Sequence, residues 1–253
     1  MFLFKRLLLY FNLIFWIGGL EYVRLNKTWA WWFLGLAVVL LFLTIFDFTK
    51  KTFNRRFFNF LITPLIFSIS VFGSLLFVFV DLYYHLIVLG SGIFIYLFLE
   101  QILNYFYFAV RYQPYTLEYF SFYWNMLAVM AFSSCLFGFY ILYQFNVYLL
   151  AGIYLALIFL VTKEIFWVNK IEWNKYALFC VAIPLIMFEL FVVFSYLPSS
   201  YYVNAIILTV IYYVLIGLSK LFLQEKLNSK NLLSHLIVGG VSMLVVLFTA
   251  QWI

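Results

Sequence analysis

Charged side chains are scarce in this sequence, and that scarcity decides its class. Of the 253 residues, 9% are charged, whereas 68% are hydrophobic and 25% are aromatic. A soluble domain carries about 25% charged residues, so the composition excludes a soluble globular protein. It predicts instead an all-α, polytopic transmembrane helical bundle with short loops.

Residues that build catalytic and metal sites are also few. Cys135 and Cys180 both fall inside apolar segments, which excludes a disulfide framework and a CxxC motif. The two histidines, His85 and His235, fall near the outer and the inner membrane surface in the topology predicted below, so they do not predict a shared haem or metal centre. HExxH, GxSxG and phosphate-binding-loop motifs are missing. We therefore expect no cofactor and no bound metal.

Long apolar segments fill most of the chain. A helix needs about 20 apolar residues to cross the hydrocarbon core, and nine segments approach or exceed this length. We expect a single integral-membrane domain over residues 1–253, with approximate spans 7–22, 29–46, 57–80, 82–110, 118–142, 147–161, 176–197, 201–223 and 232–252. The break at Asp81 and the short sixth span are the weakest boundaries.

The basic residues predict an orientation, because lysine and arginine accumulate on the cytoplasmic side of short loops. Placing the N-terminus in the cytoplasm and the C-terminus outside leaves just Arg24 and Lys27 in outer positions. The other thirteen of the fifteen basic residues then lie inside: Lys5, Arg6, Lys50, Lys51, Arg55, Arg56, Arg111, Lys163, Lys170, Lys175, Lys220, Lys226 and Lys230. We expect this protein in the plasma (inner) membrane. The net charge of +6 is thus explained by basic residues on the cytoplasmic side of the membrane, and no nucleic-acid partner is expected.

A polar stripe follows one side of the span that begins near Asp81. Its members recur at helical spacing, in steps of three, four or seven residues: Asp81, His85, Gly92, Tyr96, Glu100, Asn104, Tyr107 and Arg111. Lipid does not satisfy such a face, so we expect it to point into the bundle. It would line either a cavity open to the cytoplasm or a tight polar contact with another span.

Carboxyl groups inside the spans are the main candidates for function, because charges at this depth are costly. Glu100, with Gln101, Asn104 and Arg111 nearby, is compatible both with a proton, ion or headgroup site and with a packing role. For Glu189 we favour a carboxyl held neutral or hydrogen-bonded to a neighbouring helix. Arg111 is expected to reach lipid phosphates from the inner helix end.

Two further features concern the surface and the packing. Asp81 and His85, one turn apart, could form a hydrogen-bonded pair or half of a metal site, but we favour surface-facing polar residues. Three small-residue pairs predict close helix contacts inside the bundle: Ser70 with Ser74, Ser134 with Gly138, and Gly152 with Ala156.

Three hypotheses for function remain open at this point. We favour a non-enzymatic bundle that interacts with membrane lipids and with a membrane-protein partner. A small transporter or permease that uses Glu100 and Glu189 as coupling sites is the first alternative. An intramembrane enzyme acting on a lipid or polyprenyl substrate is the second.

Overall fold

The chain forms long α-helices throughout the part that the structure describes, and the all-α prediction is confirmed. The structure is a computed structural model and describes residues 2–49, 55–107 and 114–250. Nine helices in this part are long and apolar enough to cross a membrane, as expected for a multi-pass membrane protein. They are α1 (Phe2–Leu25), α2 (Ala30–Phe48), α3 (Arg55–Leu75), α4 (Asp81–Tyr107), α5 (Pro114–Tyr143), α6 (Val147–Val168), α7 (Trp173–Ser195), α8 (Tyr201–Leu223) and α9 (Ser229–Thr249), with a short 3₁₀ helix, η1 (Lys27–Trp29), before α2.

The sixth helix differs from its prediction. The apolar segment was expected to end at residue 161, but α6 continues to Val168. Lys163 and Glu164 lower the hydropathy at that point without interrupting the backbone hydrogen bonds of a helix. The extra turns bring Thr162 and Glu164 into the span, where both are buried.

Several helix ends are fixed by local hydrogen bonds. The side chains of Asn146, Ser200 and Asn228 accept backbone N–H groups at the starts of α6, α8 and α9, which satisfies donors that have no partner within a helix. Gln144 and Lys170 follow α5 and α6 with positive φ angles of 55° and 57°. This left-handed conformation ends a helix and turns the chain towards the next one.

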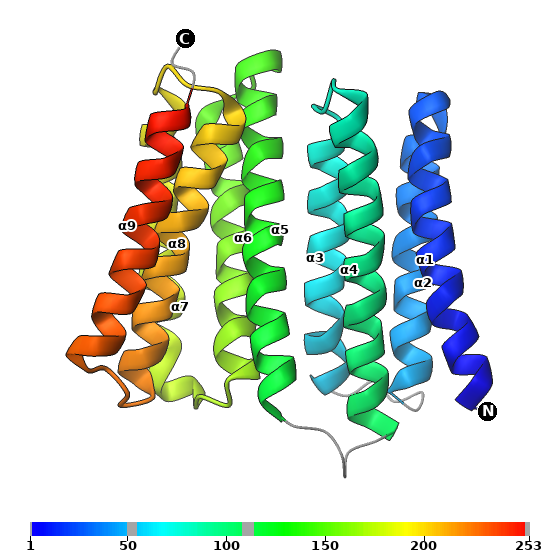
Figure 1. Cartoon of the computed structure of the whole chain (residues 1–253), viewed down its shortest axis with the longest axis horizontal. Helices are drawn as coiled ribbons and strands as arrows, with labels where there is room; N and C mark the ends of the chain where they lie inside the picture. Colours follow the sequence, from blue (N-terminus) through cyan, green and yellow to red (C-terminus); the bar gives the residue numbers. More distant parts are fainter. Residues whose placement is uncertain (1, 50–54, 108–113, 251–253) are drawn as a thin grey trace. The chain divides into compact units, whose positions relative to one another are not determined.

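The contacts divide the chain into two compact units, Met1–Trp124 and Asn125–Ile253. In the first unit α1 packs against α2 and α4, and α3 packs against α2 and α4. In the second unit α6 packs against α7, α7 against α8, and α8 against α9. Within each unit, neighbouring helices run alongside one another (Figure 1). The single domain over residues 1–253 stays a prediction.

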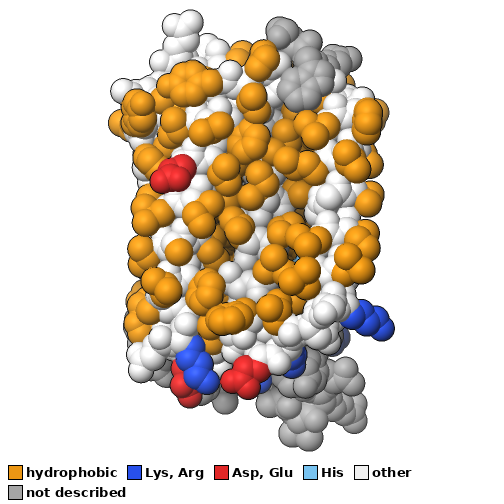
Figure 2. All heavy atoms as spheres, turned by 90° about the vertical axis from the view of Figure 1, so that its left-hand side faces the viewer, with side chains coloured by type: hydrophobic (Ala, Val, Ile, Leu, Met, Phe, Trp, Pro, Cys, Tyr) orange, Lys and Arg blue, Asp and Glu red, His pale blue; other side chains and the backbone are white. Residues whose placement is uncertain are grey.

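The surface of the second unit has the pattern that a bilayer requires. Figure 2 shows hydrophobic side chains covering the middle of the face that carries α9, with charged side chains gathered towards one end. An acidic side chain also interrupts the hydrophobic band in this view. On α9 itself, Leu236, Val241, Leu244 and Phe248 are exposed, as lipid-facing residues would be.

Candidate functional site

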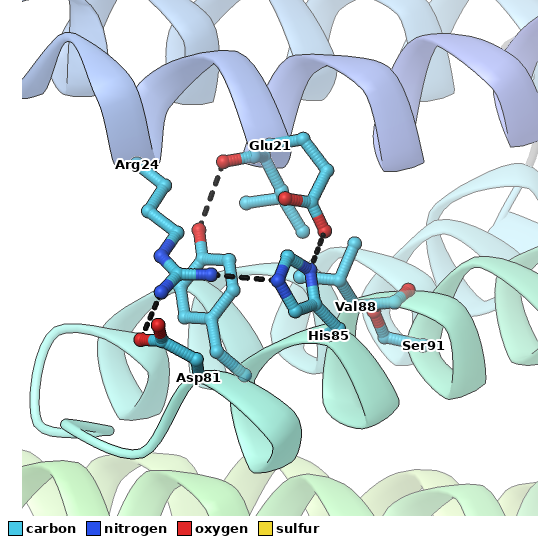
Figure 3. A network of polar contacts seen from close by, with 8 residues as sticks. Glu21, Arg24, Asp81, His85, Val88 and Ser91 are labelled. Carbon is cyan, nitrogen blue, oxygen red and sulfur yellow. Dashed lines mark hydrogen bonds and ion pairs between the residues drawn. The ribbon is translucent and has the colours of Figure 1, made fainter.

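The polar stripe of α4 meets α1, and the contact begins at the helix ends that carry Arg24 and Asp81 (Figure 3). Arg24 Nη2 forms an ion pair with Asp81 Oδ1, and Arg24 Nη1 lies 2.8 Å from His85 Nε2. His85 Nδ1 lies 2.7 Å from Glu21 Oε1. Tyr84 donates a 2.8 Å hydrogen bond to the carbonyl of Leu20. Two residues of α1 thus hold two residues of α4 in one continuous chain of polar contacts.

These partners assign the proton on the His85 ring. A guanidinium has donors and no acceptor, so the Nε2 atom that faces Arg24 must accept. The proton then lies on Nδ1, which donates to the Glu21 carboxylate. With both ring nitrogens engaged, His85 has no free nitrogen for a metal or a substrate proton. Among the described residues, no group of three or more His, Cys, Asp or Glu side chains could hold a metal ion.

The middle of the stripe is closed by packing. A Cβ atom added to Gly92 would lie 2.6 Å from Ile17 Cγ1, so α1 uses the space that the missing side chain leaves. Trp16 Nε1 donates a 2.9 Å hydrogen bond to Ser91 Oγ. One turn further along α4, the rings of Tyr96 and Tyr10 have centroids 5.4 Å apart. The stripe is therefore a helix–helix contact along this part of its length.

At the other end of the stripe a buried lysine joins three helices. Lys5 on α1 has a side chain that is 3% exposed, and its Nζ lies 3.0 Å from the Asp47 carboxylate of α2. The same ammonium group donates to the Asp47 carbonyl at 2.8 Å and to the Tyr107 hydroxyl of α4 at 2.5 Å. A charge with a counterion and two acceptors can be buried at acceptable cost. Tyr107, a candidate from the sequence, therefore contacts Lys5.

The other stripe candidates are less enclosed. Glu100 and Asn104 are half-buried. Glu100 lies within electrostatic range of Tyr96, as does Arg6 of α1, so charges of both signs lie near that hydroxyl. Arg111 lies outside the described residues.

The second unit contains a buried carboxyl that the sequence analysis missed. Glu164 of α6 is 4% exposed, and the Asn125 side-chain amide of α5 donates a 3.3 Å hydrogen bond to it. Two residues earlier, the hydroxyls of Thr162 and Tyr212 lie 3.0 Å apart, which joins α6 to α8. The under-predicted length of the sixth span hid Glu164. A hydropathy window that allowed two charged residues would have extended the sixth span as far as Glu164.

Glu189 lies in the seventh span, as expected. It is exposed on α7, and no described residue is hydrogen-bonded or ion-paired with it. Of the two expected states of this carboxyl, the hydrogen bond to a neighbouring helix is not found among the described residues, and a carboxyl held neutral stays a prediction. Its backbone position on α7 directs the side chain away from Met187 and Phe191, which are both buried.

Small-residue packing gives a mixed result. Ser70, Ser74 and Ser134 are buried, in agreement with the expectation for the third and fifth spans. Gly152 and Ala156 on α6 are exposed, and a Cβ added to Gly152 would meet nothing within 4 Å. The prediction of an internal contact there is wrong, because the buried face of α6 is the opposite one, which carries Tyr154.

The site residues that sequence analysis missed are mainly partners of those it found. Arg24 and Lys5 were treated as charges at the membrane surfaces, although they belong to the last and the first turn of α1, and Glu21, about one turn before the end of the same helix, was not singled out. Asn12, which donates a 2.8 Å hydrogen bond to Thr44, repeats with Lys5 at a spacing of seven residues. That repeat was an available signal for a polar side of the first span.

Comparison with known proteins adds no family to this description. No family model, no curated protein and no solved structure matches the chain.

Proposed function

We propose that this protein is a non-enzymatic membrane bundle whose polar side chains hold its helices together and whose outer faces interact with lipids and a membrane-protein partner. The observation that carries the proposal is the contact between α1 and α4. Near the two ends and in the middle of α4, Asp81, Ser91 and Tyr107 bind polar groups of α1. Polar groups that bind a neighbouring helix stabilise the contact between the two helices, as a structural scaffold requires.

The space beside this contact supports the same proposal. A cavity lined by Asn12, Trp16, Ala37, Leu41 and Ile95, among others, has a volume of about 10 Å³. A volume of roughly 10–15 Å³ is what one water molecule needs. The cavity offers no room for a transported solute or for a lipid substrate.

Cysteine accessibility tests the proposal. In a background with Cys135→Ala and Cys180→Ala, single cysteines replace Asp81, Ser91 or Tyr96, and a membrane-impermeant, water-soluble thiol reagent is added to either side of reconstituted liposomes. We expect labelling at position 81, where the side chain is 77% exposed, and protection at 91 and 96. Rapid labelling at both protected positions would reveal a water-filled passage along α4 and would overturn the proposal.

One observation favours a transporter as the second candidate. The buried Glu164 and Thr162 lie within one turn of α6, and the Thr162 hydroxyl pairs with the Tyr212 hydroxyl of α8. Buried carboxyls within membrane spans are found in the proton relays of pumps and transporters. Thr162→Cys in the same background separates the candidates: labelling that changes sides when the membrane pH gradient is reversed supports transport, and lasting protection supports a packing role.

A further inference from the structure

Glu189 is a carboxyl on the hydrophobic surface of α7, well inside the span. It lies six positions before Ser195, where α7 ends, which is about 9 Å at 1.5 Å per residue. Its exposed neighbours one turn away are Leu185, Ile186 and Val193. The described residues of the same chain give it no hydrogen bond and no counterion.

The carboxyl group cannot easily reach water from this position. Side chains on a helix lean towards its N-terminus, so Glu189 leans towards the Trp173 end of α7 and away from the nearer end at Ser195. Its two methylene groups are also too few to span the remaining distance, unlike the long stem of a lysine. The group therefore needs a hydrogen-bonding partner within the membrane.

The face that carries Glu189 has the spacing of a helix-pairing seam. Its positions follow alternating steps of four and three residues and are exposed or half-buried: Leu178, Ala182, Leu185, Glu189, Val192 and Tyr196. Steps of four and three residues give the 3.5-residue repeat with which two helices pack in a left-handed crossing, a common geometry in membranes. Glu189 occupies one position of this seam.

We propose that this seam packs against the same seam of a second copy of the chain, with the two Glu189 carboxyls hydrogen-bonded to each other. Two copies inserted with the same topology present Glu189 at the same depth, and a two-fold axis along the membrane normal brings identical patches together. A protonated carboxyl is both donor and acceptor, so it is complementary to itself. The second copy supplies the group that each Glu189 lacks. This inference does not depend on the proposed function.

Disulfide cross-linking in reconstituted liposomes tests the dimer. The background is again Cys135→Ala with Cys180→Ala, and the reporter is Leu185→Cys on the seam. The matched control is Val241→Cys on α9, since Leu185 and Val241 are similarly exposed, at 49% and 55%. On mild oxidation we expect linked dimers from the first variant and few from the second. Equal cross-linking at both positions would overturn the proposal, as would none at position 185.

Substitutions of Glu189 then test the role of the carboxyl. Glu189→Leu is expected to lower the association constant of the dimer about three- to thirtyfold, the range that interhelical hydrogen bonds give in membranes. Glu189→Gln should retain pairing, because an amide also donates and accepts. Single-molecule counting of fluorophores per liposome measures the constant, and unchanged thermal unfolding of each monomer in detergent shows that the fold is intact. Equal dimerisation of the leucine variant and the parent would contradict the proposal.

Discussion

The environment of Lys5 departs from what its residue type predicts. A lysine near the end of a transmembrane helix ordinarily extends to the interface, but this ammonium is buried between Asp47 and Tyr107. The Asp47 carboxylate is 27% exposed, whereas the lysine side chain is 3% exposed. The buried ammonium therefore depends on its counterion more than the carboxylate does, because water can partly solvate the carboxylate.

This inequality gives a prediction for the two single variants. Asp47→Asn leaves a buried ammonium without its counterion, while Lys5→Met leaves a carboxylate that water can partly solvate. We expect Asp47→Asn to lower the free energy of unfolding by about 1.5–3 kcal/mol and Lys5→Met to lower it less. Thermal unfolding in detergent measures both, and the opposite order would show that the ammonium is stabilised by its other acceptors alone.

His85 offers a second test at the residue scale, because its tautomer follows from its partners. Arg24 requires an acceptor at Nε2, which leaves the proton on Nδ1 facing Glu21. The chain has two histidines, so ¹⁵N-histidine labelling with a His235→Gln variant isolates the signals of His85. We expect the Nδ1–H tautomer near neutral pH. Arg24→Gln should produce a mixture of tautomers; an Nε2–H signal in the parent protein would contradict the network.

At the scale of the element, two adjacent glycines on α1 have different environments. A Cβ at Gly19 would lie 2.0 Å from Phe33 Cε2, whereas a Cβ at Gly18 would meet nothing within 4 Å. The Phe33 ring packs against Phe15 and Trp16, with centroids 5.5 and 5.8 Å away. It therefore has little freedom to move, and α1 and α2 approach closely at Gly19.

These glycines form a matched pair for experiment. Gly19→Ala should cost about 1–3 kcal/mol of stability through overpacking, while Gly18→Ala should change stability little. Both variants alter the helix backbone in the same way, so their difference in melting temperature in detergent isolates the contact with Phe33. Equal melting temperatures would mean that α1 and α2 separate readily at this point.

The sequence predicted α4 better than α6, for a physical reason. The helical spacing of Asp81, His85, Tyr96 and Tyr107 predicts a polar face, since helical periodicity is a local property. The extent of α6 depends on Glu164, whose burial relies on Asn125 of another helix. Such a residue lowers the average hydropathy of its segment whether or not another helix supplies a hydrogen-bonding partner.

For the whole molecule, the number of spans could be predicted and the packing of the spans could not. Each helix must be apolar to cross a bilayer wherever it packs, so hydropathy indicates all nine. Contacts such as that between Lys5 and Tyr107 join residues 102 positions apart, and no pattern along the chain encodes that pairing. The division at Trp124 likewise has no counterpart in composition or in a linker.

Orientation in the membrane is the property of the whole molecule that the charges predict most directly. The structure brings the start of α1 together with the ends of α2 and α4 through Lys5, Asp47 and Tyr107, as alternating helices require. With thirteen of the fifteen basic residues assigned to that side, we expect it to face the cytoplasm. Of the two remaining basic residues, Arg24 is ion-paired with Asp81.

Two reporter fusions test this orientation. A reporter inserted between Lys51 and Arg55 should be cytoplasmic, and one fused after Ile253 should lie outside, because nine spans place the two termini on opposite sides. Alkaline phosphatase, which is active outside, and green fluorescent protein, which fluoresces inside, give opposite signals at each site. If both sites reported the same compartment, an odd number of membrane crossings between them would be excluded, and at least one of the seven helices α3 to α9 would have to lie along the membrane surface.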